Sequence, residues 1–487
     1  MKKLLSLILA LVLTLSLGVA GLANAQEEPI KLIWWVYTTG DALIDTPIVV
    51  EAANAYSAEK IGVTIDLIFK TAEQINLGMT TGEYYDITFT CDWCNSFASN
   101  AYNEMFYDIT DLVQSQTPAL YEAIDQTYWD VAASINDRIY AVPTLKDMAT
   151  MMFFRLDQER YEAIGMELKE KMEFADLEEY LAAYKENYDD VYPLPLGKAG
   201  LTGFTNFCQW IAGSYLCSPY DLAGTEMENK IIPFWECEEL MNRFRLLHKW
   251  YELGYINPDA ATTESIGKDV RASVRSGAAW YGYEGWTTYA GYPIFKSNYD
   301  GPFISVATTR GAMNAINAAC SEENAIAALK YLELLNTDRT FRDILCYGIE
   351  GVHFNYLDDG TVLRTEQGKT NWSTDSYVTG SVVNASVESV SEDQRADPNQ
   401  WERVFEDYEN AQVSTLGAFS FDRTPVEAEH AACSAVMEKY VAELYTGTSD
   451  IDEVLDTIKA ELTTAGYEAV LQEAQAQLDA YLAENAE

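Results

Sequence analysis

The candidate chemistry of this chain begins with two places where an acidic and an aromatic residue lie close together. Asp92 precedes Trp93, and Glu284 lies two positions before Trp286. A sugar ring has apolar C–H faces that stack on Trp or Tyr, and its hydroxyls need polar partners. The 11 Trp and 32 Tyr residues exceed what core packing requires, which favours some of them at a binding surface. A single Trp is nevertheless more often partly buried structure than a ligand platform.

The eight cysteines offer a second kind of chemistry, because Cys91 and Cys94 have the spacing of redox and metal sites. Only three histidines are present and they are widely separated, so the supply of ligands argues against zinc. A local disulfide or two buried thiols rank ahead of a thioredoxin-like exchange role. Cys208 and Cys217 could also pair, and the sequence leaves the connectivity open. We expect no metal and no cofactor.

The familiar reactive motifs of enzymes are missing from the sequence. It has no Gly-x-x-x-x-Gly-Lys phosphate loop, no Gly-x-Gly-x-x-Gly turn, no Gly-x-Ser-x-Gly elbow and no His-Glu-x-x-His helix. A glycosidase needs only two carboxylates about 5–10 Å apart, and 76 acidic residues leave that option open. Glu284, flanked by Tyr283 and Trp286, comes closest to such an acid. An exported carbohydrate-active enzyme using paired carboxylates is therefore an alternative function.

An export signal opens the chain. Lys2 and Lys3 precede an apolar run over 4–17, and a stretch of small residues ends in Ala-Asn-Ala at 23–25. This pattern is typical of a secretory signal peptide cleaved before Gln26, and the run is shorter than the roughly 20 residues of a membrane span. No cysteine follows the run, so lipid anchoring is not supported. We expect an extracytoplasmic protein of the cell envelope, periplasmic or secreted.

The net charge of the chain bears on its partners. The formal charge is −44 at pH 7, whereas nucleic-acid binding needs a basic surface. We therefore expect no nucleic acid as partner, and anionic membrane surfaces are disfavoured for the same reason. The 487 residues can bury more than one core, which predicts two lobes or domains.

The elements that must position the candidate residues follow from hydrophobic patterning. Strands and helices alternate after the signal, with strands at 31–37, 63–69 and 85–90 and helices near 46–60 and 72–81. This alternation predicts a parallel sheet covered on both faces, and ligands gather at the carboxyl ends of such strands. Asp41, Asp92 and Trp93 follow the first and third strands, so we expect them at the binding rim.

Later patterns predict a second lobe and a helical end. The expected elements are a strand at 138–143, helices at 176–187 and 236–253, a second, strand-like crossing at 302–308, a helix over 325–335, a polar loop at 385–400, and helices at 451–462 and 470–482. The first crossing to the second lobe is expected at 150–155. Gly466 is a plausible stop between the last two helices.

Several segments, taken in order, resemble one family of known proteins. They are 31–37 (KLIWWVY), 85–89, 107–112, 140–143 (YAVP), 315–319 and 325–338, followed by 347–354 (YGIEGVHF), 416–422 (LGAFSFD) and 473–479. The sequence is similar to the bacterial extracellular solute-binding proteins of ABC importers, carbohydrate-uptake class, family 1 type. The last three segments resemble the subgroup with a DUF3502-type C-terminal domain.

The resemblance implies an α/β, two-lobed periplasmic-binding-protein-like fold of type II. Each lobe is expected to be a sheet flanked by helices, joined to the other by a hinge, with a helical C-terminal region. The implied divisions are 1–25 for the signal peptide, 26–145 and 303–345 for the first lobe, 146–302 for the second, and 346–487 for a DUF3502-like region completing the lobes.

The resemblance also implies a function without catalysis. The expected role is capture of a carbohydrate, an oligosaccharide, by hinge closure and delivery to membrane permease subunits driven by a separate ATPase. The protein is expected to be a monomer. Two competing functions are a receptor for a peptide or another polar solute and a surface adhesion protein. Rim position and chemistry select the expected ligand contacts, which are Tyr37, Asp41, Asp92 and Trp93 on one lobe and Tyr283, Glu284 and Trp286 on the other.

Overall fold

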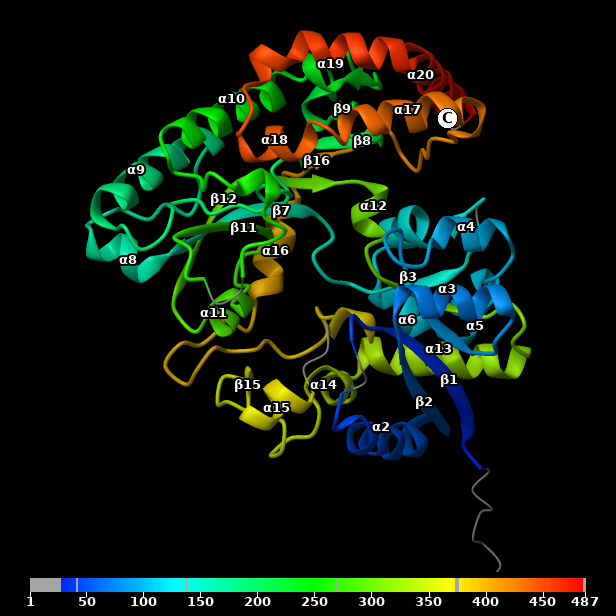
Figure 1. Ribbon diagram of the computed structural model, residues 1–487. Coiled ribbons are helices and arrows are strands. Elements are labelled where there is room, and N and C mark those ends of the chain that lie inside the picture. The colour runs from blue at the N-terminus through cyan, green and yellow to red at the C-terminus, as the bar shows by residue number, and fades with distance from the viewer. Residues whose placement is uncertain (1–27, 41–42, 137, 268–269, 373–375, 485–487) are drawn as a thin grey trace, which may run out of the picture.

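The protein consists of two lobes, each built from its own sheets and helices (Figure 1). The computed structural model describes residues 28–40, 43–136, 138–267, 270–372 and 376–484. The predicted signal peptide and Asp41 lie outside the described residues. No helix in the described ranges is long and apolar enough to cross a membrane.

The first lobe is built on a five-stranded sheet. Its strand order is β2 (Val63–Lys70), β1 (Ile30–Tyr37), β3 (Ile87–Thr90), β13 (Met313–Ile316) and β6 (Ala141–Pro143). β1 is parallel to β2 and β3, whereas β13 is antiparallel to β3 and β6. The three predicted N-terminal strands are confirmed. A return strand from residues far along the chain, β13, completes the sheet between them and β6.

The predicted strand at 138–143 is wrong in extent. Residues Arg138–Ile139 form β5, which pairs with β4 (Ser134–Ile135) in a small hairpin outside the main sheet. The amide of Tyr140 donates to the carbonyl of Ala133 at 3.0 Å, which turns the chain before β6 begins. Only the last three residues of the predicted strand join the large sheet.

Alternating burial explains why β1 can be covered on both faces. Leu32, Trp34 and Val36 belong to the core shared with α13 (Glu322–Thr337), whereas Trp35 packs with Ile75 of α3 (Ala72–Thr81) on the other face. Side chains alternate in direction along a strand, so one apolar run serves two cores. Further helices of this lobe include α2 (Thr46–Ile61), α4 (Phe97–Tyr102), α5 (Thr110–Gln116), α6 (Pro118–Ala123), α7 (Gln126–Tyr128), α14 (Arg339–Tyr347) and α15 (Glu366–Asn371).

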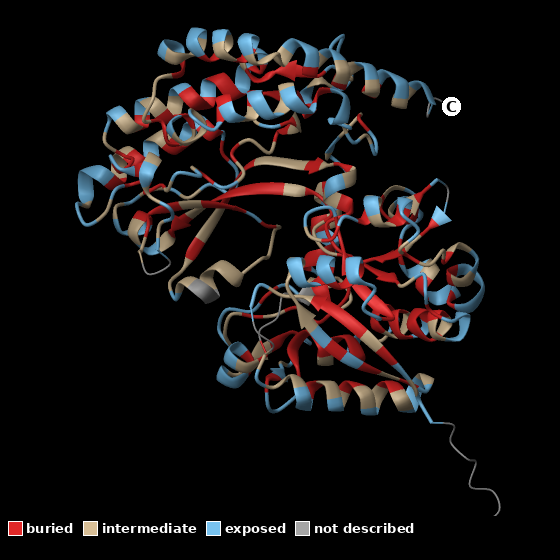
Figure 2. Ribbon diagram, turned by 45° about the vertical axis from the view of Figure 1, so that its right-hand side comes forward, coloured by how far each residue is buried: buried red, intermediate tan, exposed pale blue. Residues whose placement is uncertain are grey.

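The second lobe has a four-stranded and a three-stranded sheet. The first has the order β11 (Val274–Ala278), β7 (Thr150–Asp157), β12 (Ile294–Ile304) and β16 (Gln412–Val413), and the second β10 (Ile232–Pro233), β9 (Leu216–Pro219) and β8 (Cys208–Ala212). Helices of this lobe include α8 (Gln158–Ala163), α9 (Leu177–Asn187), α10 (Glu238–Glu252) and α16 (Gln400–Tyr408). Figure 2 shows buried strands inside each lobe and exposed residues along the outer faces of the helices.

The predicted strand-like crossing at 302–308 is corrected by the structure. β12 ends at Ile304, and the short helix α12 (Val306–Thr309) follows. The Ser305 hydroxyl accepts from the amide of Thr308, and the Thr308 hydroxyl accepts from the amide of Ser305, at 3.3 and 3.0 Å. This capping box starts a helix where the residue pattern predicts a strand.

Within the described ranges, three connections join the lobes (Figure 1). They run between β6 and β7, between β12 and β13, and through the segment before α16, where the predicted loop at 385–400 is confirmed. A cluster of apolar residues packs beside them, which we call the hinge cluster: Met148, Ala149, Met151, Phe153, Ala279, Val387, Ala396, Trp401, Val404 and Tyr408.

The last four helices pack on the second lobe: α17 (Glu427–Met437), α18 (Val441–Thr446), α19 (Ile451–Ala465) and α20 (Tyr467–Glu484). Gly466 ends α19 in the left-handed conformation at φ 92°, and its amide donates to the carbonyls of Leu462 and Thr463. The predicted stop at Gly466 is therefore confirmed. The segment after α14 packs instead on the first lobe, where Trp372 and Val378 are fully buried. The C-terminal third of the chain thus contributes to both lobes.

Candidate ligand-binding site

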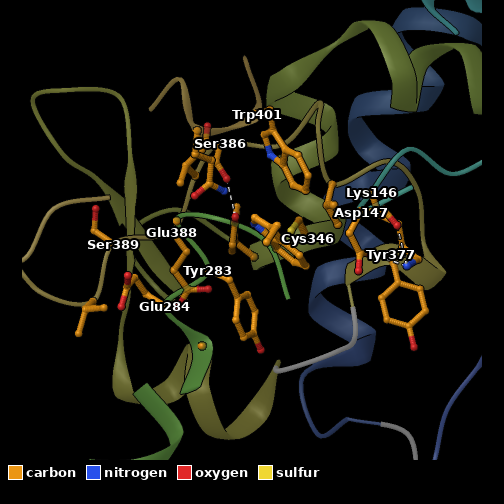
Figure 3. Close-up of a pocket in the computed structure, with 18 of the residues that line it drawn as sticks. Lys146, Asp147, Tyr283, Glu284, Cys346, Tyr377, Ser386, Glu388, Ser389 and Trp401 are labelled. Atoms are coloured by element: carbon orange, nitrogen blue, oxygen red, sulfur yellow. Dashed lines mark hydrogen bonds and ion pairs between the residues drawn. The ribbon is translucent and has the colours of Figure 1, made fainter. Parts of the chain in front are cut away.

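A cavity of about 640 Å³ lies between the lobes. Ligand pockets for small molecules are typically about 300–1,000 Å³ and combine apolar walls with a few polar groups. Figure 3 shows Lys146, Asp147 and Tyr377 on one side of this cavity, Tyr283 and Glu284 on another, and Trp401 between them. Both lobes and the connections between them therefore contribute to one site.

Trp93 forms the wall of the first lobe. Its indole nitrogen donates to the carbonyl of Gly311 at 2.8 Å, and its ring packs edge-on against Tyr37 with 5.0 Å between centroids. Just beyond it, the buried Asn95 side chain donates to the carbonyl of Phe89 at 3.2 Å, which holds the turn after β3. The Trp93 side chain is oriented by these contacts, yet the residue keeps 52% of its surface exposed. A flat aromatic face is thus available at the carboxyl ends of β1 and β3.

The wall of the second lobe comes from the turn between β11 and α11 (Gly285–Ala290). Tyr283 packs against Trp280 at 4.8 Å, and Trp280 stacks on Trp401 of α16 at 5.2 Å with 28° between the rings. Glu284 forms an ion pair with Lys296 at 2.7 Å. The aromatic residues of this turn and of the hinge cluster therefore form one continuous surface.

Residues after α14 close the third side. The Arg364 guanidinium is nearly buried and donates to the carbonyl of Trp372 at 2.6 Å and to Glu388 at 3.1 Å. It also lies over the ring of Tyr347, 4.9 Å from the centroid. These contacts fix Arg364 as part of the wall, since its donors already have partners on three sides.

The charges that line the cavity balance. Three basic side chains, Lys146, Arg364 and Lys369, face three acidic ones, Asp147, Glu284 and Glu388. Each has an ion-pair partner, at 2.6 Å for Lys146 with Asp147 and 3.0 Å for Lys369 with Glu366. Ion-paired carboxylates and cations offer hydrogen bonds without an excess field of either sign. The lining therefore suits a polar, uncharged solute better than an anion or a cation.

Two buried polar atoms in the lining have no hydrogen-bond partner among the described residues. They are the indole nitrogen of Trp280 and the side-chain oxygen of Gln400. A buried donor or acceptor left unpaired costs roughly 1–3 kcal/mol. Such groups in a binding wall are a source of affinity, because a ligand or a change of side-chain conformation that satisfies them recovers that energy.

The structure brings three of the sequence-predicted contacts to the cavity, namely Trp93, Tyr283 and Glu284. Tyr37 lies behind Trp93 in edge-to-face contact. Trp286 lies outside the lining and packs behind Tyr283 at 5.4 Å, with the Arg155 guanidinium 4.6 Å from its ring.

Asp92 also lies outside the lining, on the exposed turn beside Trp93. Desolvation by its neighbours raises the pKa of its carboxyl to about 6, while the charge of Arg310 acts in the opposite direction. The carboxyl is therefore poised to change its charge in mildly acidic conditions.

Several lining residues are not predictable from the sequence, above all Lys146, Tyr377, Glu388, Gln400 and Trp401. Lys146 lies just after β6, Tyr377 and Glu388 lie in segments after α14, and Gln400 and Trp401 begin α16. Their meeting at one cavity depends on how the lobes and their connections pack together. The abundance of Trp and Tyr is the one available signal, and it does not single out positions.

All eight cysteines, each within the described residues, are free thiols. Cys91 is buried and Cys94 half-buried, so of the two arrangements expected there, a local disulfide and a pair of thiols, the structure has the thiols. Throughout the described ranges, no group of three or more His, Cys, Asp or Glu side chains is arranged to hold a metal ion.

The chain is similar to known proteins in both sequence and fold. Residues 415–483 match DUF3502, a domain of unknown function. The crystal structure of an N-glycan transport solute-binding protein, NgtS, from Streptococcus pneumoniae has a TM-score of 0.81 at 23% identity, covering 94% of this chain and 100% of that one. This chain has the fold of a solute-binding protein. Complexes of NgtS with Man1GlcNAc and Man5GlcNAc give TM-scores of 0.70 and 0.68.

The similarity to solute-binding proteins extends over essentially the whole chain. A carbohydrate ABC transporter substrate-binding protein from Streptococcus pneumoniae serotype 4 (strain TIGR4) is 26% identical over 502 residues, which is 97% of each chain. The resemblance to extracellular solute-binding proteins with a DUF3502-type C-terminal domain is confirmed. The DUF3502 match corresponds to the second-lobe part of the C-terminal region.

Proposed function

We propose that this protein is the extracytoplasmic solute-binding component of an ABC importer and that it captures an uncharged oligosaccharide between its lobes. The observation that carries the proposal is the cavity between the lobes, where the aromatic side chains of Trp93 and Tyr283, the latter backed by Trp280 and Trp401, lie among balanced polar groups. Aromatic faces match the C–H faces of sugar rings, and the paired charges match their hydroxyls. The similarity to a carbohydrate substrate-binding protein over the whole chain supports the same class of solute.

Closure of the lobes on the solute is part of the proposal. The TM-score of 0.81 with NgtS falls to 0.70 and 0.68 with its glycan complexes. A different angle between the lobes in the complexes would account for that drop, and this chain then corresponds to the more open arrangement. A ligand that contacts both lobes shifts such an equilibrium toward the closed form. The closed protein would then deliver its solute to permease subunits powered by a separate ATPase.

The carbohydrate-active enzyme remains the competing function, and the lining argues against it. A glycosidase needs one carboxyl group as acid and a second as base or nucleophile. The three acidic side chains of the lining, Asp147, Glu284 and Glu388, are each held in an ion pair with Lys or Arg. The wall is therefore organised for hydrogen bonding, and capture without cleavage is the function that it supports best.

Calorimetric titration of the purified protein with neutral oligosaccharides tests the proposal. The panel contains Man1GlcNAc, Man5GlcNAc and manno- and chito-oligosaccharide ladders, together with sialylated glycans, uronate oligosaccharides and peptides. We expect saturable one-to-one binding of a neutral glycan, recovered intact by mass spectrometry, with compaction visible by small-angle X-ray scattering. Release of shortened products would establish the enzyme instead, and binding of peptides alone would overturn the carbohydrate assignment.

A further inference from the structure

A second pocket of about 400 Å³ adjoins the main cavity. Residues common to the lining of both are Gly282, Glu284 and Val390. Gly282 and Glu284 belong to the turn of the second lobe, and Val390 belongs to the connection between the lobes. An oligosaccharide that fills the main cavity can therefore continue over this shared wall into the second pocket and stay in contact with the protein.

The second pocket has the same kind of lining as the first. Tyr281 contributes an aromatic ring that the Arg403 guanidinium covers at 4.4 Å from the centroid. Arg403 also reaches Glu170 at 3.6 Å, and Lys296 holds Glu284 at 2.7 Å. Its charged residues again balance, three acidic against three basic: Glu170, Glu284 and Asp397 with Lys296, Arg395 and Arg403. The chemistry that suits a neutral sugar is thus repeated on the far side of the shared wall.

The shared wall itself is built for close approach. Gly282 has φ 81°, and a Cβ there would lie 2.5 Å from the side-chain oxygen of Gln400. That oxygen is buried without a hydrogen-bond partner among the described residues, in a residue that is only 8% exposed. Because glycine has no side chain, the shared wall at this position does not project into the space between the two pockets. The Gln400 side-chain oxygen next to it can still accept a hydrogen bond.

The geometry points to a second saccharide subsite in this pocket, which receives the units of an oligosaccharide that extend beyond the main cavity over Gly282 and Glu284. The inference rests on the proposed function and adds to it a preference for longer or branched neutral glycans. Each sugar unit that gains one or two net hydrogen bonds should tighten binding on the order of tenfold.

The test compares a short and a long probe on matched variants. Arg403→Ala removes a side chain that is 55% exposed and lies in the second pocket only, whereas Arg245→Ala removes one that is 46% exposed and lies in neither pocket. Gln394→Ala, on the exposed connection, is an independent second variant. Calorimetry measures Kd for Man1GlcNAc, Man5GlcNAc and the di- to hexasaccharide ladders with each protein.

We expect the wild type to bind the longer probe of a pair about tenfold more tightly. Arg403→Ala and Gln394→Ala should abolish that gain and leave the affinity for the short probe unchanged, while Arg245→Ala should alter neither. Equal affinities for short and long probes, or equal loss of both in Arg403→Ala, would overturn the subsite while the proposed function stands. If no glycan binds the wild type, the proposed function itself fails and the subsite with it.

Discussion

Replacement of Trp93 by alanine is the sharpest test of the cavity as a saccharide site. The residue keeps 52% of its surface exposed in the wall of the first lobe, and a Trp side chain has about 250 Å² to bury. Roughly 130 Å² is thus available to a ligand, and at about 25 cal/mol per Å² its complete burial would contribute on the order of 3 kcal/mol. A sugar that covers one ring face uses about half of this.

The expected result is therefore a loss of about 1.5–3 kcal/mol in binding free energy, or a Kd about 10- to 100-fold higher. Folding should change little, because alanine removes one hydrogen bond to Gly311 and the ring contacts with Tyr37 and Phe89 from a residue that is already half exposed. Such a hydrogen bond contributes about 1 kcal/mol net. Trp93→Phe keeps a smaller ring face and loses the N–H donor, so its Kd should lie between those of the wild type and Trp93→Ala.

Calorimetry with the best neutral glycan, combined with thermal unfolding of each variant, measures both quantities. Tyr102→Ala is the matched control, since this aromatic residue of the same lobe is 63% exposed and does not line the cavity. A Kd for Trp93→Ala within about threefold of the wild type, in a protein that unfolds at the same temperature, would refute the stacking role. An equal loss in Tyr102→Ala would show that the effect is general to the lobe.

Three further changes test the scaffold, each followed by chemical or thermal unfolding. Arg243→Met leaves Asp300, its buried partner at 2.6 Å, without a counter-charge. It should lower the free energy of unfolding by about 3–5 kcal/mol. The double variant Arg243→Met, Asp300→Leu has no unpaired buried charge and should regain part of that free energy. The pKa of Asp92 is raised to about 6, so the contribution of this carboxyl to stability falls as pH rises from about 4 to 6. Asp92→Asn removes that contribution, so over this range the variant should lose less stability, or gain more, than the wild type. An identical pH dependence in the two proteins would contradict the assignment. Gly447 has φ 71°, and Gly447→Ala would place a Cβ 2.2 Å from the carbonyl oxygen of Leu247. This variant should destabilise the fold by on the order of 1–3 kcal/mol. Unchanged stability would show that the backbone adjusts freely.

The strands of the first lobe could be predicted because their signals are local. The KLIWWVY run alternates between two cores, and the turns after parallel neighbours β1 and β3 meet at one edge. That rule alone places Trp93 at the binding rim. The return strand β13 pairs with β3 although the two lie far apart in sequence, and the ordered resemblance, rather than any local pattern, predicts that the chain returns to this lobe.

The rest of the site depends on information that no local pattern contains. Trp286 and Glu284 are neighbours in sequence, yet α11 turns the Trp286 ring toward Gly277, where a Cβ would lie 2.7 Å from the indole. Trp401 and Arg364 come from segments whose position depends on the packing of the hinge cluster and on carbonyls such as that of Trp372. Non-local packing of this kind decides which aromatic residues face a ligand.

The charge of the whole chain and the charge of the cavity act at different distances. At physiological ionic strength the Debye length is about 8 Å, so the net charge of −44 is felt chiefly by solutes approaching the exposed surface. Inside the cavity, each cation and carboxylate already has an ion-pair partner. An anionic glycan would meet repulsion outside and no surplus cation within, whereas a neutral glycan meets neither penalty. Both scales therefore support the proposed selection for uncharged oligosaccharides, and raising the salt concentration should change the affinity for a neutral glycan little.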